Sequence, residues 1–121
     1  MNELQKFGSK GEELATSFLI NKGYSIRHRN WRVGHIELDI IAENADYIII
    51  VEVKTRKNDK FCHPSDAVNH TKIKRIVNAT QAYIFKYNIS KDIRFDIISI
   101  IPTSNGNFEI EHQEDAFYPP I

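Results

Sequence analysis

The chain has 121 residues, 41% of them hydrophobic and 26% charged, and its 16 basic and 16 acidic residues give a net charge of zero. This length provides one core, so we expect a single domain over residues 1–121. Because the N-terminus is polar and no run approaches roughly 18 apolar residues, we expect neither a signal peptide nor a membrane span. A single cysteine, Cys62, excludes an internal disulfide. We therefore expect a cytoplasmic protein that does not act on membranes.

Hydrophobic periodicity predicts seven elements in the order α-β-β-β-α-β-β. The first helix is expected to stop at Gly23, and the second to be capped by Thr71 or Ser65. Between the third strand and the second helix we expect a polar loop over 55–66. The expected elements are a helix over 4–22, strands over 24–32, 36–42 and 47–54, a helix over 70–88, and strands over 93–101 and 108–112.

This order predicts the α/β class, a layered domain with a mixed five-stranded sheet. The strand over 47–54, the second helix and the strand over 93–101 form a crossover, which makes these two strands parallel. The Ser104–Asn107 segment is typical of a hairpin turn, and the last strand is expected at a sheet edge.

Charged residues interrupt the two strands on either side of the turn over 43–46. If this turn closes a hairpin, residues whose numbers sum to 91 face each other, with Asp39 opposite Glu52 and Glu37 opposite Lys54. Cross-strand partners share a face, so one face is charged and the other apolar. The charged face is expected to hold Glu37, Asp39, Ile41, Ile48, Ile50, Glu52 and Lys54, and the apolar face Leu38, Ile40, Ala42, Ile49, Val51 and Val53.

The opposed carboxylates of this hairpin need compensation, because burying unpaired charge costs several kcal/mol per ion. A divalent cation between Asp39 and Glu52 would supply it, since Mg²⁺ and Mn²⁺ prefer oxygen ligands. The alternative is a partly exposed face on which Lys54 neutralises Glu37 and nothing binds. Spacing alone leaves both interpretations open.

Basic residues surround these strands although the net charge is zero. Local positive charge favours phosphate contacts, and the alternative is a solvated surface. Arg56 and Lys72 are candidates for nucleic-acid contacts. Arg29 and Arg32 flank Trp31, which would either stack on exposed bases or anchor a hairpin.

Lys54 is the one lysine with a carboxylate two residues before it, and Asp39…Glu52-Val53-Lys54 resembles the signature of the PD-(D/E)xK nuclease superfamily. Almost the whole chain resembles the bacterial YraN family within that superfamily. One departure is Ile36, where that family usually has glycine. The further motifs are Gly8-x-x-Gly11-Glu12-x-x-Ala15-x-x-Phe18-Leu19, Gly23-Tyr24, Arg29-Asn30-Trp31-Arg32, Glu37–Ala42, Val51–Arg56, Pro64, Ala67-Val68, Lys72, Arg94-Phe95-Asp96, Glu111-His112 and Ala116-Phe117.

The resemblance implies a restriction-endonuclease-like fold and a set of catalytic roles. Asp39 and Glu52 would hold Mg²⁺ or Mn²⁺, with the Val53 carbonyl as a further ligand. Lys54 would orient or help deprotonate the attacking water. Glu12 matches a helix glutamate that approaches the metal in related nucleases, and its alternative is a surface position. For Glu37 a ligand, a partner of Lys54 and a hairpin salt bridge all stay open.

We therefore expect a metal-dependent endonuclease-like protein that hydrolyses DNA phosphodiester bonds, on branched or damaged DNA. Two alternatives remain: a nucleic-acid-binding module without turnover, and a scaffold that uses the charged face in a protein interface. A domain of this size would hold a long duplex as a homodimer, with a protein partner, or with a recognition surface in trans.

Overall fold

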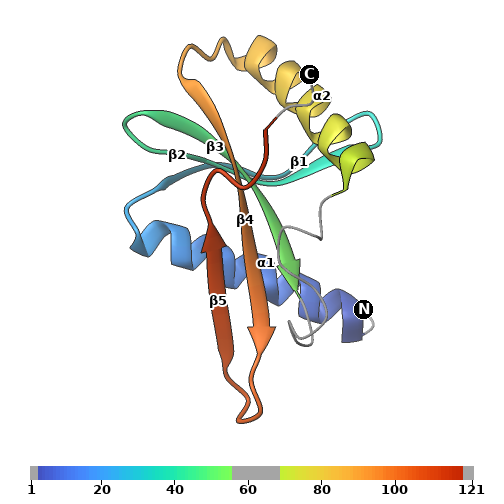
Figure 1. Cartoon of the computed structure of the whole chain (residues 1–121), viewed down its shortest axis with the longest axis vertical. Helices are drawn as coiled ribbons and strands as arrows, with labels where there is room; N and C mark the ends of the chain where they lie inside the picture. The colour runs from blue at the N-terminus through green and yellow to red at the C-terminus, as the bar shows by residue number, and fades with distance from the viewer. Residues whose placement is uncertain (1–2, 56–68, 119–121) are drawn as a thin grey trace.

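The computed structural model describes residues 3–55 and 69–118, with side chains from Lys10 onward. Its elements follow the expected α-β-β-β-α-β-β order (Figure 1). Neither helix in the described part is long and apolar enough to cross a membrane. The elements are α1 (Glu3–Asn21), β1 (Ser25–Val33), β2 (Ile36–Glu43), β3 (Tyr47–Thr55), α2 (His70–Tyr87), β4 (Asp92–Pro102) and β5 (Phe108–Gln113).

The five strands form one mixed sheet in the order β1-β2-β3-β4-β5. Three of the four neighbouring pairs are antiparallel, and β3 and β4, which α2 connects, are parallel. This arrangement confirms the expected α/β class, the mixed five-stranded sheet and the crossover.

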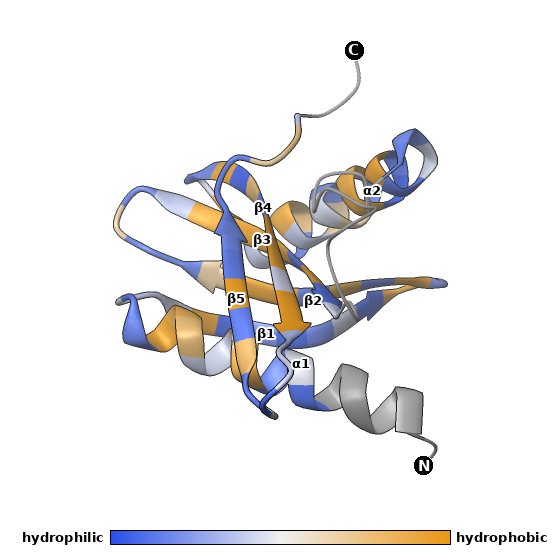
Figure 2. Cartoon of the chain, turned by 60° about the horizontal axis from the view of Figure 1, so that its bottom comes forward, coloured by the Kyte–Doolittle hydropathy of each residue, from blue (hydrophilic) through white to orange (hydrophobic). Residues whose placement is uncertain are grey.

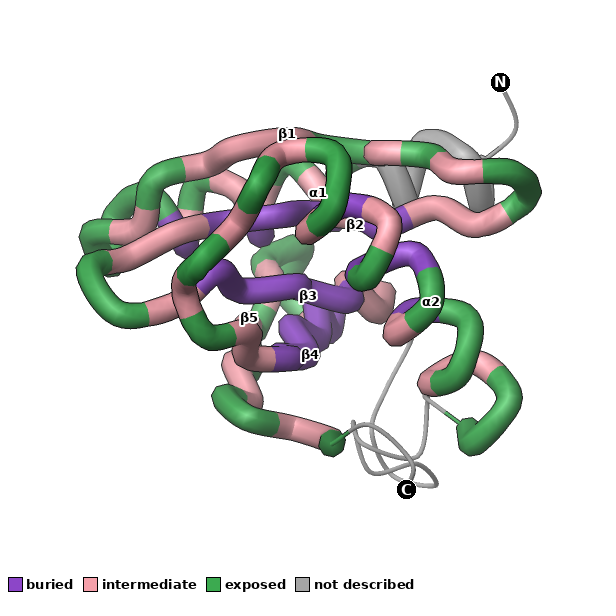
Figure 3. Tube along the Cα trace, turned by 90° about the horizontal axis from the view of Figure 1, so that it is seen from above, coloured by how far each residue is buried: buried purple, intermediate pink, exposed green. Residues whose placement is uncertain are grey.

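The two helices pack on opposite faces of the sheet and produce two hydrophobic cores. Ala15 and Leu19 of α1 pack against one face, and Ile76, Ala79 and Tyr83 of α2 pack against the other. The middle strands are therefore buried on both sides, which explains their continuous apolar sequences. Figure 3 shows buried residues running along β2, β3 and β4, whereas β1 and β5 alternate between half-buried and exposed. The hydropathy colours of Figure 2 show the same contrast between β4 and the edge strand β5.

The N-cap of the second helix lies two residues before Thr71, which was one of the two expected caps. Asn69 is its N-cap, and the Oδ1 atom of Asn69 accepts a hydrogen bond of 2.9 Å from the Lys72 N–H. The expectation of a cap at Thr71 is wrong, because Thr71 lies within the first turn of the helix. Ser65 and nearly all of the expected loop over 55–66 lie outside the described residues. Asn88 ends α2 with a φ of 53°.

The turn between β2 and β3 sets the expected register. The side chain of Asn44 accepts hydrogen bonds from the backbone N–H groups of Asp46 and Tyr47, which closes a short hairpin. The ladder then runs from the Glu43–Ile48 pair to the Ile40–Val51 pair, and every pair sums to 91. The register is therefore confirmed over these four pairs.

Candidate metal centre

The candidate site lies where β2 and β3 separate. Their ladder stops at Ile40 and Val51, so the expected backbone pairs Asp39–Glu52 and Glu37–Lys54 are not formed. Instead, the Oδ2 atom of Asp39 accepts a hydrogen bond of 2.9 Å from the Val53 N–H. Repulsion between the opposed carboxylates favours separation of the strands, and a charged oxygen is a stronger acceptor than a backbone carbonyl. Where the two strands separate, the backbone N–H of Val53 therefore holds the carboxylate of Asp39 in place.

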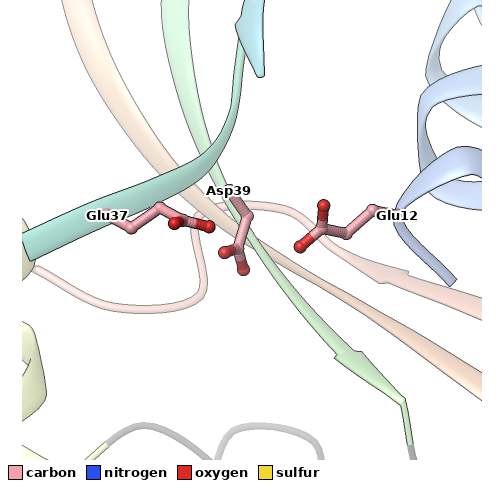
Figure 4. A group of neighbouring side chains, drawn as sticks. All are labelled: Glu12, Glu37 and Asp39. Atoms are coloured by element: carbon pink, nitrogen blue, oxygen red, sulfur yellow. The ribbon is translucent and has the colours of Figure 1, made fainter. Parts of the chain in front are cut away.

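Side-chain alternation in β2 also changes at this point, which corrects part of the expected faces. Ile40 packs on the α1 side, as expected for the apolar face, but Leu38 packs in the α2 core. Opposite this point in β1, Asn30 has a φ of 52°, in the left-handed region. As a result Glu37 and Asp39 do not share the face of Ile41, Ile48 and Ile50, and their carboxylates point toward Glu12 of α1 (Figure 4).

Glu12, Glu37 and Asp39 form a group of three carboxylates, here called the acid group. One oxygen from each lies within 4.8 Å of the others, and Figure 4 shows the three side chains converging from α1 and β2. Helix α1 comes close enough because of Gly11, where a Cβ atom would overlap Cγ2 of Thr55 at the end of β3. Glu12 is therefore half-buried next to Glu37 and Asp39, and its role at a metal stays a prediction.

Glu52 of β3 lies next to two amines rather than in the acid group. Its Oε1 atom is 2.6 Å from the Nζ atom of Lys72 and 3.6 Å from the Nζ atom of Lys54. The side chain of Glu52 is only 9% exposed, so its ion pairs with the two lysines are largely shielded from solvent. The Asn69 cap fixes the first turn of α2 and thereby the position from which Lys72 reaches the sheet.

The electrostatics of Asp39 set it apart from an ordinary carboxylate. Burial raises its pKa from 3.8 to about 7, and the nearby carboxylates of Glu52 and Glu12 act in the same direction. Burial also raises the pKa of Glu12. The positive charge nearby, from Lys72 at Asp39 and from Arg29 at Glu12, does not offset the effect of burial on these pKa values. A cation bound between them would restore the ionised forms.

The oxygen set around Asp39 has the chemistry that a hard divalent cation prefers. Four carboxylates come from three elements: Glu12 from α1, Glu37 and Asp39 from β2, and Glu52 from β3. The backbone of Val53 adds to them, because the N–H and C=O of one residue in an extended strand point to the same side. Since the Val53 N–H points to Asp39, its carbonyl lies on the same side.

Lys54 and Lys72 sit so close together that each affects the other. Burial lowers the pKa of Lys54, and the ammonium group of Lys72 lowers it further. The pKa of Lys72 is raised, although burial opposes this, because Glu52 and Lys54 share hydrogen bonds with it. Lys54 therefore loses a proton more readily than Lys72. A group that exchanges protons with water needs this property.

The arginines expected to contact nucleic acid do not gather at one place in the described part of the chain. Arg32 forms an ion pair of 2.7 Å with Glu37, so Glu37 pairs across the β1–β2 hairpin and not with Lys54. Arg29 is exposed and lies within electrostatic range of Glu12. Arg56 lies outside the described residues. Whether Arg29, Arg32 and Lys72 contact phosphate stays a prediction.

The ring of Trp31 belongs to the α2 core. Its centroid lies 5.1 Å from that of Tyr83 in an edge-on arrangement, and Trp31 packs against the buried residues of that face. This packing against α2 favours a structural role for Trp31, and stacking on bases stays a prediction that no contact here supports.

One residue of the site and one contact within it escaped the sequence argument. Asn30 hydrogen-bonds with the Glu12 side chain, and its left-handed backbone marks the point where the strand faces change. Lys72, a candidate for phosphate contact, forms an ion pair with Glu52 that the sequence argument did not predict. Asparagine within a strand-like run was an available signal, because Asn tolerates positive φ better than most residues. No signal in the sequence joined Lys72 to Glu52, since the helix docking decides that contact.

Comparison with known proteins places the chain among bacterial relatives of similar length. The model of the uncharacterised protein family UPF0102 matches residues 11–100. A UPF0102 protein of Phocaeicola vulgatus is 53% identical over 121 residues, which cover all of this chain and 99% of the relative. One of Bacteroides thetaiotaomicron is 50% identical with the same coverage. A more distant one, of Thermodesulfovibrio yellowstonii, is 39% identical over 113 residues, 93% of this chain and 96% of the relative.

Proposed function

We propose that this chain, which belongs to the uncharacterised protein family UPF0102, is a metal-dependent endonuclease-like protein that hydrolyses DNA phosphodiester bonds. Family membership confirms the resemblance inferred from the sequence but assigns no activity. The observation that carries the proposal is the convergence of Asp39 with Glu12 and Glu37, close to Glu52, together with a pKa of Asp39 that is raised to about 7.

In this proposal Asp39 and Glu52, with the Val53 carbonyl and Glu12 beside them, hold Mg²⁺ or Mn²⁺. Such an ion, when bound, lowers the pKa of a water ligand and neutralises charge on a phosphate. The protein orients the oxygens through the Val53 N–H on Asp39 and the Asn30 contact to Glu12. These contacts fix the ligands before binding, which reduces the cost of ordering them.

Lys54 supplies the remaining part of the chemistry. It lies beside Glu52, and its lowered pKa favours proton exchange with an attacking water. A cationic amine at this position also stabilises the charge that develops on the phosphate oxygens. Lys72 lies 2.6 Å from the same oxygen of Glu52 and holds the carboxylate in place.

Metal binding is tested by calorimetric titration of Mn²⁺ into the wild-type protein and three variants. We expect Asp39→Asn and Glu12→Gln to weaken binding by at least about tenfold, because each removes a charged oxygen. Glu13→Gln is the matched control, since Glu13 is exposed on the same helix. The affinity of the wild type should rise between about pH 6 and pH 8 as the Asp39 proton leaves. Equal affinities of all four proteins would refute the metal site.

Turnover is tested with branched, flapped, single-stranded and linear DNA in the presence of Mn²⁺, Mg²⁺ or EDTA. The proposal expects nicking that requires the metal and that is lost in Asp39→Asn and in Lys54→Met. Lys74→Met is the control, because Lys74 is an exposed lysine of α2 outside the site. Metal binding without nicking of any of these substrates would contradict the nuclease.

One observation favours the non-catalytic alternative. Lys72 already compensates Glu52 at 2.6 Å, which is the role that a cation would otherwise fill. If the amine and the ion compete, Lys72→Met should tighten Mn²⁺ binding. If Lys72 is the permanent counter-ion of a nucleic-acid-binding module, Lys72→Met should destabilise the protein and leave Mn²⁺ binding absent.

A further inference from the structure

A cavity of about 400 Å³ opens beside the candidate metal site, between the turn that joins β1 to β2 and the first turns of α2. Glu37 and Lys72 line it, and both also take part in the site, through the acid group and the ion pair with Glu52. A molecule in this cavity would therefore lie directly next to the proposed metal site.

The walls of the cavity combine three kinds of chemistry. Lys72 and Arg75 bring positive charge, and no hydrogen bond or ion pair engages the Arg75 side chain within residues 3–55 and 69–118. Ile36 and Ile76 form an apolar surface. Glu37 brings a carboxylate, and Asn69 and Thr71 at the start of α2 bring further polar groups.

A phosphate alone would not need such walls. The apolar surface of Ile36 and Ile76 gains nothing from a phosphate, and the carboxylate of Glu37 would repel it. A nucleobase uses all three kinds of wall: its face packs on apolar side chains, and its edge offers donors and acceptors to carboxylate, amide and guanidinium groups. Its 5′ or 3′ phosphate would then meet the free charge of Arg75.

We propose that this cavity receives one unpaired nucleotide of the DNA, next to the bond that is cut. The inference rests on the proposed function and names its substrate class: DNA with an unpaired nucleotide, as in a bulge, flap or branch. The volume is within the roughly 300–1,000 Å³ of sites for small molecules, so a single nucleotide fits and a duplex does not. An unpaired base enters at least cost, because it need not be pulled from a stack.

The test compares three DNA ligands of equal length by fluorescence anisotropy in EDTA and at low salt, where no hydrolysis occurs. They are a fully paired duplex, the duplex with a one-nucleotide bulge, and the same bulge with an abasic residue. We expect the wild type to bind the bulge about tenfold more tightly than the abasic bulge, a difference of about 1.4 kcal/mol.

Two variants locate this preference in the cavity. Arg75→Ala should reduce the bulge-to-abasic ratio to about twofold, whereas Lys74→Ala removes the neighbouring exposed charge and should leave the ratio unchanged. Thr71→Glu adds a carboxylate to the cavity wall at a helix N-terminus that favours negative charge, so the fold is retained while the bulge binds more weakly.

The outcomes separate the inference from the proposed function. Equal affinity of the wild type for the bulge and the abasic bulge overturns the inference, even if the protein cuts DNA. The same reduction of the ratio by Lys74→Ala as by Arg75→Ala also overturns it. A base-dependent preference without metal-dependent cleavage supports the cavity and contradicts the nuclease.

Discussion

Two aspartates on the same sheet, the half-buried Asp39 and the buried Asp96, have opposite environments. Asp39 of β2 faces other carboxylates, and burial raises its pKa to about 7. Asp96 of β4 is fully buried, yet its pKa is lowered, because hydrogen bonds from His112 and Arg94 outweigh the effect of burial. The backbone N–H of Asp115 donates a third hydrogen bond, of 3.0 Å.

Hydrogen bonds around Asp96, here called the Asp96 network, connect parts of the chain that are distant in the sequence. Lys22, just after α1, contacts Nδ1 of His112 at 2.9 Å, and Nε2 of His112 lies 2.7 Å from Asp96. The ammonium group of Lys22 can only donate, so His112 carries its proton on Nε2 and donates it to Asp96. The network thus links the region after α1 with β4, β5 and the segment after β5.

The comparison teaches that burial of a charge does not identify a functional site. The set of partners does, because a fully compensated carboxylate is inert and an uncompensated one can take up a proton or a cation. The two aspartates should therefore respond in opposite ways to the same kinds of substitution.

The largest effect is expected at the compensated aspartate. Asp96→Ala removes the buried carboxylate that pairs with Arg94 and His112, and should lower the free energy of unfolding by about 3–5 kcal/mol. Equilibrium urea unfolding measures it. A loss below about 1 kcal/mol would mean that the network does not hold these elements together.

The uncompensated aspartate should behave in the reverse way. Asp39 binds its proton more tightly in the folded than in the unfolded chain, so metal-free stability should fall as the pH rises from about 4 to about 7. Asp39→Asn keeps an oxygen for the Val53 N–H and removes this dependence. We expect it to be more stable than the wild type above pH 7, by up to about 4 kcal/mol. Urea unfolding at several pH values checks this, and parallel pH profiles of the two proteins would contradict it.

A smaller effect is expected where α1 approaches the site. Gly11→Ala places a methyl group on Thr55 and should cost about 1–2 kcal/mol, since overpacking exceeds what alanine gains in a helix. It should also weaken Mn²⁺ binding by moving Glu12. Adding Thr55→Ala removes the overlap, so the double variant should recover both properties.

The smallest effect is expected at the start of α2. Asn69→Ala removes the cap on the Lys72 N–H and should lower the free energy of unfolding by about 1 kcal/mol. Asn69→Ser retains a capping oxygen and is the matched control. Thermal unfolding of both variants measures the difference, and equal losses would show that the cap contributes nothing.

Local patterns were sufficient for the elements and for one hairpin. Apolar periodicity predicted both helices and all five strands, and the turn at Asn44 set the register that pairs Ile40 with Val51. The same patterns failed at the N-cap of α2, because several polar residues near its start were equally good caps and Asn69 was not among those considered.

The sequence by itself determined the α/β order, the crossover and the presence of Asp39 and Glu52 on neighbouring strands, because these depend on short-range spacing. Only the tertiary structure decided where the strands part, that Glu37 and Glu12 join Asp39, and that Lys72 neutralises Glu52. The physical reason is that these contacts join elements distant in the chain. They depend on helix docking and on charge repulsion between strands, and neither leaves a periodic trace in the sequence.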